Sequence, residues 1–445
     1  MGNAEQPAAS GFTFARRLGL LYAALFFVVG CYLPFLPVWF DWRALDAGEI
    51  AVLLAAPLFT RIVFTPLIGF AADLAGSRRN IVIALAWGSL LSFLLLWAAS
   101  GFWQMLAASI LLAINWTTIM PLIETVAARG IRTGTLHYGR VRLWGSLSFI
   151  AANLGSGIII GLIGAKIVMP LLVTGTMLLV LGAHLLPRDL DGKGRGPAPL
   201  NRLKFADAFR LVHAPVFLLF LLAASLIQAS HALYYSFGTL HWRAEGIPDG
   251  VIGLLWSIGV IAEVALFAAS ARVIAAVGTA RLLMLAGLAA ALRWGVMALD
   301  PPLLLLGPLQ TLHAMSFGAA HVAAIHFLTQ VVPEERAATA QGLYAAAVAG
   351  IALGSATLAS GPLYASFGGA AYGAMALLAL TGAAGAYRLT QLWQERPVDA
   401  AAIETAQTQE MWPQDFATPP IDPAQDEAAG QPQSSAEGGR TEPPS

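Results

Sequence analysis

The sequence predicts an all-α membrane protein of twelve transmembrane helices. Its composition, its helix-length apolar segments and one polar stretch near mid-chain support this fold class. Of the 445 residues, 58% are hydrophobic and only 11% are charged, whereas soluble domains carry about 25% charged residues. A soluble chain of this composition would expose large apolar patches, which lipid would instead solvate. The formal net charge of +0 gives no indication of binding to nucleic acid.

Apolar segments of roughly 20 residues are predicted to be helices, because a helix of that length crosses the bilayer and lipid offers no partner to an unpaired backbone group. The first such segment follows Arg16 and Arg17. It is longer than the apolar core of a cleavable signal peptide, so we expect it to be retained. Twelve segments qualify: residues 17–40, 49–72, 80–99, 102–126, 141–163, 167–186, 213–239, 249–271, 281–299, 302–328, 338–362 and 370–392.

Basic residues set the expected orientation, because cytoplasmic segments are enriched in lysine and arginine. With the N-terminus inside, 20 of the 25 basic residues fall in cytoplasmic segments or at their edges. Arg43, Lys166 and Arg243 fall outside, and Arg61 and Arg293 fall within spans. Both termini are therefore predicted to be cytoplasmic, in a cell membrane of the bacterial inner-membrane type.

Polar stretches divide the chain into five parts. The tail is rich in proline, glutamine, alanine and acids, so we expect it to be disordered and solvated, although a binding role stays open. Cys31 is the single cysteine of the sequence, which excludes an intrachain disulfide. The parts are an N-terminal cytoplasmic segment (1–15), an N-terminal six-helix bundle (16–187), a central cytoplasmic loop (188–212), a C-terminal six-helix bundle (213–393) and the tail (394–445).

Seven ionisable residues fall within or near the ends of predicted spans, where a charge at the bilayer centre costs about 3 kcal/mol or more. Interhelical ion pairs, such as Glu263 with Arg293, are one explanation for any single residue. For the set as a whole, a polar binding cavity between the helices explains them better. The seven are Arg61, Glu124, Arg142, Glu263, Arg293, His313 and His321.

The charge count of this set favours an anionic substrate. Three arginines face two glutamates, and a guanidinium holds a carboxylate through two parallel hydrogen bonds. His313 and His321 are eight residues apart and so share a broad helix face. Each could carry a proton near neutral pH or simply pack. Three aromatic residues could stack a ring of the substrate, although packing is their commoner role: Trp116, Trp144 and Tyr235.

Two pairs of glycines have the small-xxx-small spacing that lets helices approach closely: Gly157 with Gly161, and Gly350 with Gly354. Packing alone and a gating role both explain them. No Walker motif, nucleophile–base set or metal-ligand cluster occurs in the sequence. We therefore expect no enzyme, no cofactor and no metal. The expected partners are a small-molecule substrate, a proton and the lipid bilayer, and the chain is expected to act as a monomer.

The segment between the second and third spans resembles the G-x-x-x-D-x-x-G-x-R-[KR] loop of the major facilitator superfamily. Asp73 could pair with basic groups at a helix end, and a tight turn needs Gly76, so the loop is expected to act as a cytoplasmic gating latch. The resemblance implies the major facilitator fold of two pseudo-symmetric six-helix bundles. The matching residues are Gly69, Asp73, Gly76, Arg78 and Arg79.

A closer resemblance lies in two segments, Pro121–Glu124 and Tyr138–Ser146, which are similar to the phenylpropionate permease-like branch, related to lactose permease. It continues through Tyr234-Tyr235, Trp256–Glu263, Arg293–Gly295 and His313 to His321. The resemblance implies that an acid and an arginine, Glu124 and Arg142, grip the substrate. It also implies that Glu263, His313 and Arg293 link substrate to proton. An arginine at the position of Arg61, in the second span, resembles the pattern of this branch but is not part of the lactose permease pattern.

Three departures affect the proton pathway. Lactose permeases carry a lysine three residues before the histidine and a glutamate three after it, where this chain has Gln310 and Ser316. Their helix 7 aspartate is Gln228 here, so an amide pair is expected in place of a charge pair. The proton-carrying glutamate is absent, and we expect Glu263, with His313 and His321, to hold the proton instead.

Together these features predict a secondary active transporter. The favoured activity is proton-coupled symport of a small organic solute by alternating access, with a phenylpropionate-like carboxylate as first choice. A sugar or nucleoside symporter, an exporter and a non-transporting membrane sensor are the alternatives.

Overall fold

The computed structural model describes residues 6–75, 77–132, 136, 138–187 and 205–393, and within these ranges the regular structure is helical. The tail from residue 394 lies outside the described residues. The helices of the N-terminal half are α1 (Gln6–Trp42), α2 (Ala47–Ala75), α3 (Arg78–Ala98), α4 (Phe102–Trp116), α5 (Ile119–Arg132), α6 (Tyr138–Ile163), the short η1 (Ala165–Ile167) and α7 (Val168–Leu185).

The C-terminal half begins with α8, which lies in the stretch 188–212 that was predicted to be a loop. Its helices are α8 (Phe205–Val212), α9 (Pro215–Ala229), α10 (Ala232–Ala244), α11 (Asp249–Val277), α12 (Thr279–Met297), α13 (Leu303–Thr311), the π-helical η3 (Ala314–Ala319), α14 (Ala320–Val331), α15 (Glu334–Ala345), the π-helical η4 (Ala346–Ala352), α16 (Leu353–Phe367), η5 (Gly368–Ala371) and α17 (Tyr372–Leu392).

Eleven segments of the described chain are long and apolar enough to cross a membrane. The last of them, Thr339–Leu392, has 54 residues and contains both α16 and α17. These helices are separated by η5, which begins at Gly368, where φ is +54°. A straight helix of that length would measure roughly 80 Å, far more than a bilayer core of about 30 Å. The chain turns at this glycine, and the count of twelve spans stays a prediction.

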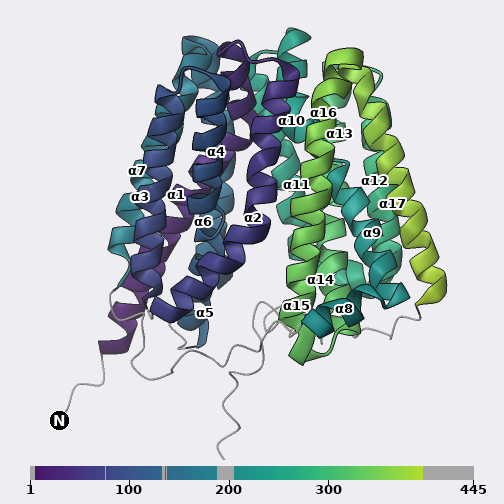
Figure 1. The fold of residues 1–445 in the computed structure, drawn as a ribbon, viewed down its shortest axis with the longest axis horizontal. Coiled ribbons are helices and arrows are strands. Elements are labelled where there is room, and N and C mark those ends of the chain that lie inside the picture. The colour runs from purple at the N-terminus through teal and green to yellow at the C-terminus, as the bar shows by residue number, and fades with distance from the viewer. Residues whose placement is uncertain (1–5, 76, 133–135, 137, 188–204, 394–445) are drawn as a thin grey trace, which may run out of the picture.

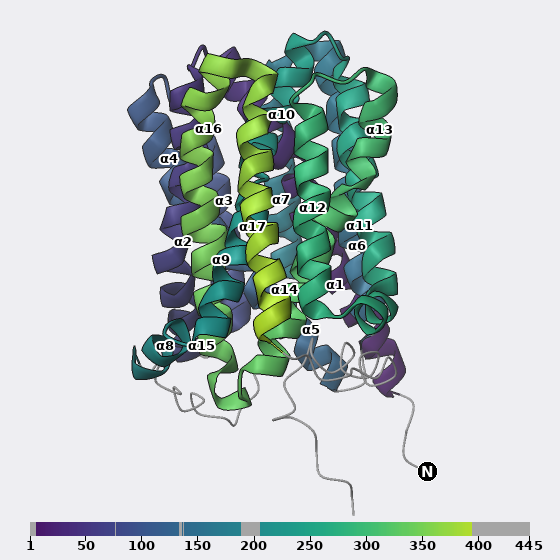
Figure 2. The same ribbon diagram turned by 90° about the vertical axis from the view of Figure 1, so that its right-hand side faces the viewer.

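The helices form two bundles side by side, with α1–α7 in one and α8–α17 in the other (Figure 1). The start of α1 and the end of α17 lie at the same end of the molecule, the lower end in Figure 1, and the turned view in Figure 2 agrees. Their cytoplasmic placement stays a prediction.

The buried side chains show where the two bundles hold together. One hydrophobic cluster combines residues of both bundles, including Trp39, Phe237 and Trp294, and its members come from the helix ends remote from the N-terminus. Two further clusters are each confined to one bundle, around Ile123 and around Phe327, and they lie toward the opposite end. The bundles therefore share a core at one end and pack separately at the other.

Glycines make close contact between the bundles possible. A Cβ at Gly157 would collide with the backbone of Asp249, and one at Gly350 would collide with Ile62. Gly354 lies against the ring of Phe59 in the same way. Three of the four glycines with small-xxx-small spacing thus form the seams α6–α11 and α2–η4–α16, which confirms the expected close packing.

Several predicted spans are interrupted near their middle. The expected span 213–239 breaks between α9 and α10 at Ser230 and His231, and the span 302–328 passes through η3 directly after His313. Interrupted and π-helical turns free backbone groups and commonly mark functional positions. These two breaks lie beside the predicted histidine site, since the rings of His231 and His313 are 5.8 Å apart.

Candidate functional site

The loop that resembles the superfamily motif fastens two helices of the first bundle. The Nε and Nη2 atoms of Arg79 donate to the backbone oxygens of Leu186 and His184, at 2.7 and 2.9 Å. Arg79 therefore joins the start of α3 to the end of α7. Gly69 lies in α2 and Arg78 is exposed at the start of α3. The side chain of Asp73 and all of Gly76 lie outside the described residues, so the latch stays a prediction.

In the first bundle, α5 and α6 bring the predicted acid and arginine together. The Nε of Arg142 lies 4.0 Å from Oε1 of Glu124, and both side chains are partly buried. The Tyr138 hydroxyl, one turn before Arg142, donates to Oε2 of Glu124 at 2.9 Å. Arg142 stacks over the ring of Phe26 at 4.1 Å. The family resemblance predicted that Glu124 and Arg142 both grip the substrate, but it did not predict the hydrogen bond from Tyr138.

In the second bundle, His313 stands between an acid and a base. Its Nε2 faces Oε2 of Glu263 at 3.4 Å, and its Nδ1 lies 3.1 Å from Nη1 of Arg293. A guanidinium can only donate, so Nδ1 of His313 must accept, which leaves the proton of a neutral ring on Nε2, pointing at Glu263. The geometry thus specifies both the tautomer of His313 and the order Glu263–His313–Arg293.

Arg293 is fully buried, at 0% exposure. Its Nη2 donates to Oε1 of Gln310 at 2.5 Å, and the guanidinium lies over the rings of Tyr234 and Trp294, at 4.7 and 4.5 Å. Within the described chain no carboxylate bonds Arg293 directly. Glu263, one histidine away, is the acid placed to balance its charge, because an uncompensated buried ion costs several kcal/mol.

His231, which is not among the predicted site residues, joins this network. It is fully buried at the break before α10, and its Nδ1 lies 3.2 Å from the backbone oxygen of Gln228. Its Nε2 lies 3.2 Å from the hydroxyl of Ser316, which in turn lies 3.5 Å from Nη1 of Arg293. A histidine beside a helix break was the available signal, but only the fold shows that it reaches Arg293.

The amide pair expected between Gln228 and Gln310 does not form. Gln310 bonds Arg293, whereas the Nε2 of Gln228 lies 3.5 Å from the backbone oxygen of Phe317. A buried guanidinium is a stronger donor than a neutral amide, which explains why Gln310 bonds the arginine.

His321 lies beyond His313 on the same face, with the ring of Phe317 between them. The three rings are nearly parallel, with centroids 5.1 Å apart for His313–Phe317 and 6.5 Å for Phe317–His321. His321 lies within electrostatic reach of Glu263. The structure therefore places both predicted histidines around one acid.

Arg142 lies on α6 and Glu263 lies on α11, two helices that pack together between the bundles. The hydroxyl of Ser257 lies 3.5 Å from the backbone oxygen of Ile150, and these helices run antiparallel. Six residues farther along α11, this register places Glu263 level with Trp144, two residues from Arg142 in α6. Arg142 is within electrostatic reach of Glu263. A single site shared by the two bundles stays a prediction.

Arg61 lies at the middle of α2, beside the seam residue Ile62, and is partly buried. In the described part of the chain it has neither a hydrogen bond nor an ion pair, unlike Arg142 and Arg293. It is therefore a partly desolvated cation whose donors are available to a ligand.

The three predicted aromatic residues have different surroundings. Trp116 packs edge-on against Phe93, with centroids 6.3 Å apart. Trp144 is 59% exposed and lies beside Gly19. Two residues from Arg142, it projects from a different face of α6. Tyr235 is partly buried and stacks near His231 at 5.8 Å, so it is the one placed next to the charged network.

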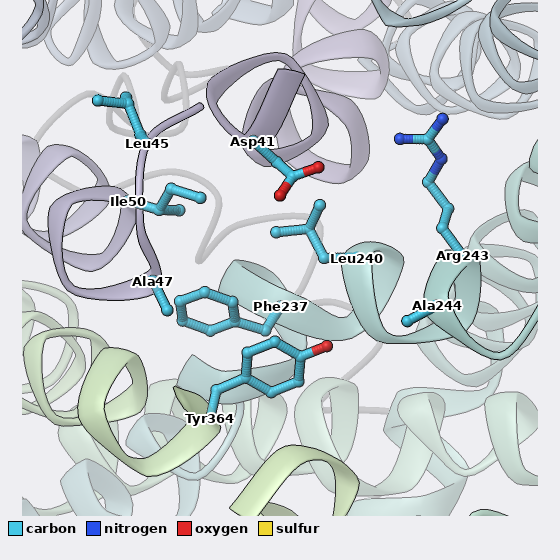
Figure 3. A pocket seen from close by; sticks show the side chains of 9 residues that line it. All are labelled: Asp41, Leu45, Ala47, Ile50, Phe237, Leu240, Arg243, Ala244 and Tyr364. Atoms are coloured by element: carbon cyan, nitrogen blue, oxygen red, sulfur yellow. The ribbon is translucent and has the colours of Figure 1, made fainter. Parts of the chain in front are cut away.

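Two features lie at the end remote from the N-terminus. A cavity of about 420 Å³ between the bundles is lined by Asp41 of α1, Arg243 of α10 and the rings of Phe237 and Tyr364 (Figure 3). It contains none of the predicted site residues. Nearby, ligand atoms of three residues come within 4.8 Å of one another: His241, Glu245 and Asp300. Here His241 already bonds Asp300 at 2.8 Å, which accounts for both groups without a metal.

Comparison with known proteins identifies the family. Residues 15–372 match the MFS_1 like family, which is part of the major facilitator superfamily. The chain belongs to this family. It is therefore a multi-pass membrane transporter of the major facilitator type, as the motifs predicted.

Among its relatives in the family, a protein of Escherichia coli (strain K12) named "Probable 3-phenylpropionic acid transporter" is 29% identical over 366 residues, which are 82% of this chain and 95% of that protein. The "Maltose permease" of Geobacillus stearothermophilus is 31% identical over 359 residues, 77% of this chain and 86% of that protein. These matches confirm the resemblance to the phenylpropionate permease-like branch and show that sugar permeases are also related.

Solved structures confirm the major facilitator fold. The nucleoside transporter NupG superposes with a TM-score of 0.73 at 18% identity, covering 86% of this chain and all of that one. A bacterial homologue of the lysosomal transporter Spinster, described as inward-facing and unoccupied, gives a TM-score of 0.64 at 15% identity, covering 88% of this chain and all of that one. At these identities the likeness shows the fold alone.

Proposed function

We propose that this transporter carries a small organic carboxylate together with a proton, by alternating access of the site between its bundles. One observation carries the proposal: Arg61 and Arg142 are partly buried arginines in the membrane-embedded region with donors that no acid satisfies. Arg61 has no ionic partner within the described chain, and Nη1 of Arg142 is buried without a hydrogen bond. The carboxylate of a substrate would accept charge-assisted hydrogen bonds from such donors.

The phenylpropionate-like class is favoured over other anions because rings lie near these charges. Arg142 already rests on Phe26, and Tyr235 stands near Glu263 on the other side of the site. The relative named as a 3-phenylpropionic acid transporter supports the same class. The maltose permease relative keeps a sugar as the second candidate.

Proton coupling is proposed to reside on Glu263. Because His313 must accept from Arg293, it presents an N–H to Glu263 and cannot take a second proton at Nδ1 without losing that bond. The proton that crosses with the substrate is therefore placed on the Glu263 carboxylate. Once Glu263 is neutral, Arg293 lacks its balancing charge, and binding of an anionic substrate becomes more favourable. This links the two binding events.

Binding is tested first with purified protein in detergent. Thermal-shift titrations with 3-phenylpropionate, maltose and uridine compare the three substrate classes, and the carboxylate alone should stabilise the protein. Stabilisation by maltose or uridine without any by carboxylates would refute the substrate class.

Coupling is tested in proteoliposomes with Glu263→Gln. Uptake of 3-phenylpropionate driven by an imposed pH gradient should be lost, while exchange of labelled for unlabelled substrate continues. Gradient-driven uptake that is unchanged in this variant would show that the proton is carried elsewhere. The same vesicles, loaded on either side, distinguish import from export.

A further inference from the structure

The hydroxyl of Tyr138 competes with Arg142 for one carboxylate. Glu124 receives a hydrogen bond from Tyr138 at 2.9 Å, on Oε2, whereas its Oε1 stays 4.0 Å from Nε of Arg142. Hydrogen bonds from nitrogen to oxygen have lengths of about 2.7–3.2 Å, so the arginine and the glutamate attract each other without being bonded. Tyr138, not Arg142, is the donor that positions Glu124.

Arg142 is held in place by groups other than Glu124. Its guanidinium lies over the ring of Phe26 at 4.1 Å. Gly145, one turn along α6, leaves the space that the guanidinium occupies, because a Cβ there would lie 3.0 Å from Nη1 of Arg142. The ring and the glycine keep the guanidinium apart from Glu124, and its buried Nη1 has no hydrogen-bond partner.

From this geometry we infer that Tyr138 is a specificity-determining residue of the site. By holding Glu124 on its own hydroxyl, Tyr138 keeps the donors of Arg142 open for the carboxylate of the substrate. Tyr138 acts on the substrate through Glu124 and Arg142, so it is a positioning residue. The inference rests on the proposed function, because it assumes an anionic substrate.

Loss of the Tyr138 hydroxyl should weaken the binding of anions. In Tyr138→Phe the Oε2 atom of Glu124 loses its donor, and a partly buried carboxylate without a donor is costly. Nε of Arg142 lies 4.0 Å from Oε1 of Glu124, and a movement of the carboxylate by about 1 Å would turn the loose pair into a hydrogen-bonded one. The guanidinium would then be neutralised by Glu124, and a substrate carboxylate would have to displace that glutamate.

The test measures equilibrium binding of 3-phenylpropionate and of its neutral analogue 3-phenylpropanamide to purified full-length protein. Tyr138→Phe should raise the Kd of the carboxylate on the order of tenfold and leave that of the amide nearly unchanged. The double variant Tyr138→Phe with Glu124→Gln should restore carboxylate binding, because the competing charge is gone. Tyr387→Phe is the matched control, since that tyrosine is 53% exposed on α17 and belongs to no part of the site.

The outcomes separate this inference from the proposed function. If the wild-type protein does not bind 3-phenylpropionate, the measurement on the wild type by itself refutes the proposed function. If the wild type binds the carboxylate and Tyr138→Phe binds it equally well, Tyr138 does not determine specificity. Equal loss of both ligands, or loss that Glu124→Gln does not reverse, would show a structural role and would overturn the inference.

Discussion

The contact between the bundles at Gly157 predicts a large difference between two neighbouring glycine-to-alanine changes. A Cβ at Gly157 would overlap the backbone oxygen of Asp249 and lie 3.2 Å from its carbonyl carbon and 3.3 Å from Cα of Gly250. These are backbone atoms and cannot rotate away. At Gly155, two residues earlier on the same helix, no atom lies within 4 Å of the added Cβ.

The magnitude follows from two opposing effects. Alanine is favoured over glycine in a helix interior by about 1 kcal/mol, and both variants gain this. Gly157→Ala must also separate α6 from α11 by about 1 Å, since carbon atoms pack at about 3.5–4.0 Å, and such overpacking costs about 1–3 kcal/mol. Gly155→Ala should therefore be as stable as the wild type or more so, and Gly157→Ala less stable than Gly155→Ala.

Thermal unfolding of the purified proteins in the same detergent provides the assay. A difference of 1–3 kcal/mol between the variants should lower the melting temperature of Gly157→Ala by about 2 °C or more relative to Gly155→Ala. Equal melting temperatures would mean that α6 and α11 do not touch at this point. The close packing of the two bundles along these helices would then be refuted.

Two further predictions concern arginines. Replacing Arg61 with glutamine should weaken binding of 3-phenylpropionate on the order of tenfold, because a charge-assisted bond is lost. It should also raise the melting temperature of the empty protein, because a cation without a partner is removed. The control is Arg210→Gln, an exposed arginine of α8, and equal binding by both variants would exclude Arg61 from the site. Arg79→Gln should lower the free energy of unfolding by about 1–2 kcal/mol through loss of its two carbonyl bonds. The exposed Lys166→Gln should not, and equal stability of these two variants would contradict the fastening of α3 to α7.

Much of the fold could be read from the sequence because lipid imposes a simple rule on it. Each span must be a helix of nearly fixed length, so apolar runs locate the helices within a few residues. The apolar pattern could not predict a helix break within a span. Ser230 and His231 lie in the middle of an apolar run, and a break there depends on the side chains that satisfy the freed backbone groups.

The candidate site, like the fold, was predicted only in part from the sequence. The pair Glu124 and Arg142 was predicted because its spacing resembles a known family, and the structure places the two residues 4.0 Å apart. The expected pairing of Gln228 with Gln310 was wrong, because a choice among buried partners depends on distances between helices, which no spacing within one helix reveals.

The sequence by itself determined that the chain lies in lipid, that it is helical, and which charged residues fall within its spans. This is possible because the cost of burying each charged residue in lipid is a local property of the chain. Tertiary structure alone decided how those charges are shared: His313 between Glu263 and Arg293, Tyr138 on Glu124, and Arg61 without an ionic partner in the described chain. Such sharing depends on packing between helices that are distant in sequence, and at buried sites a difference of 1 Å decides whether two groups bond.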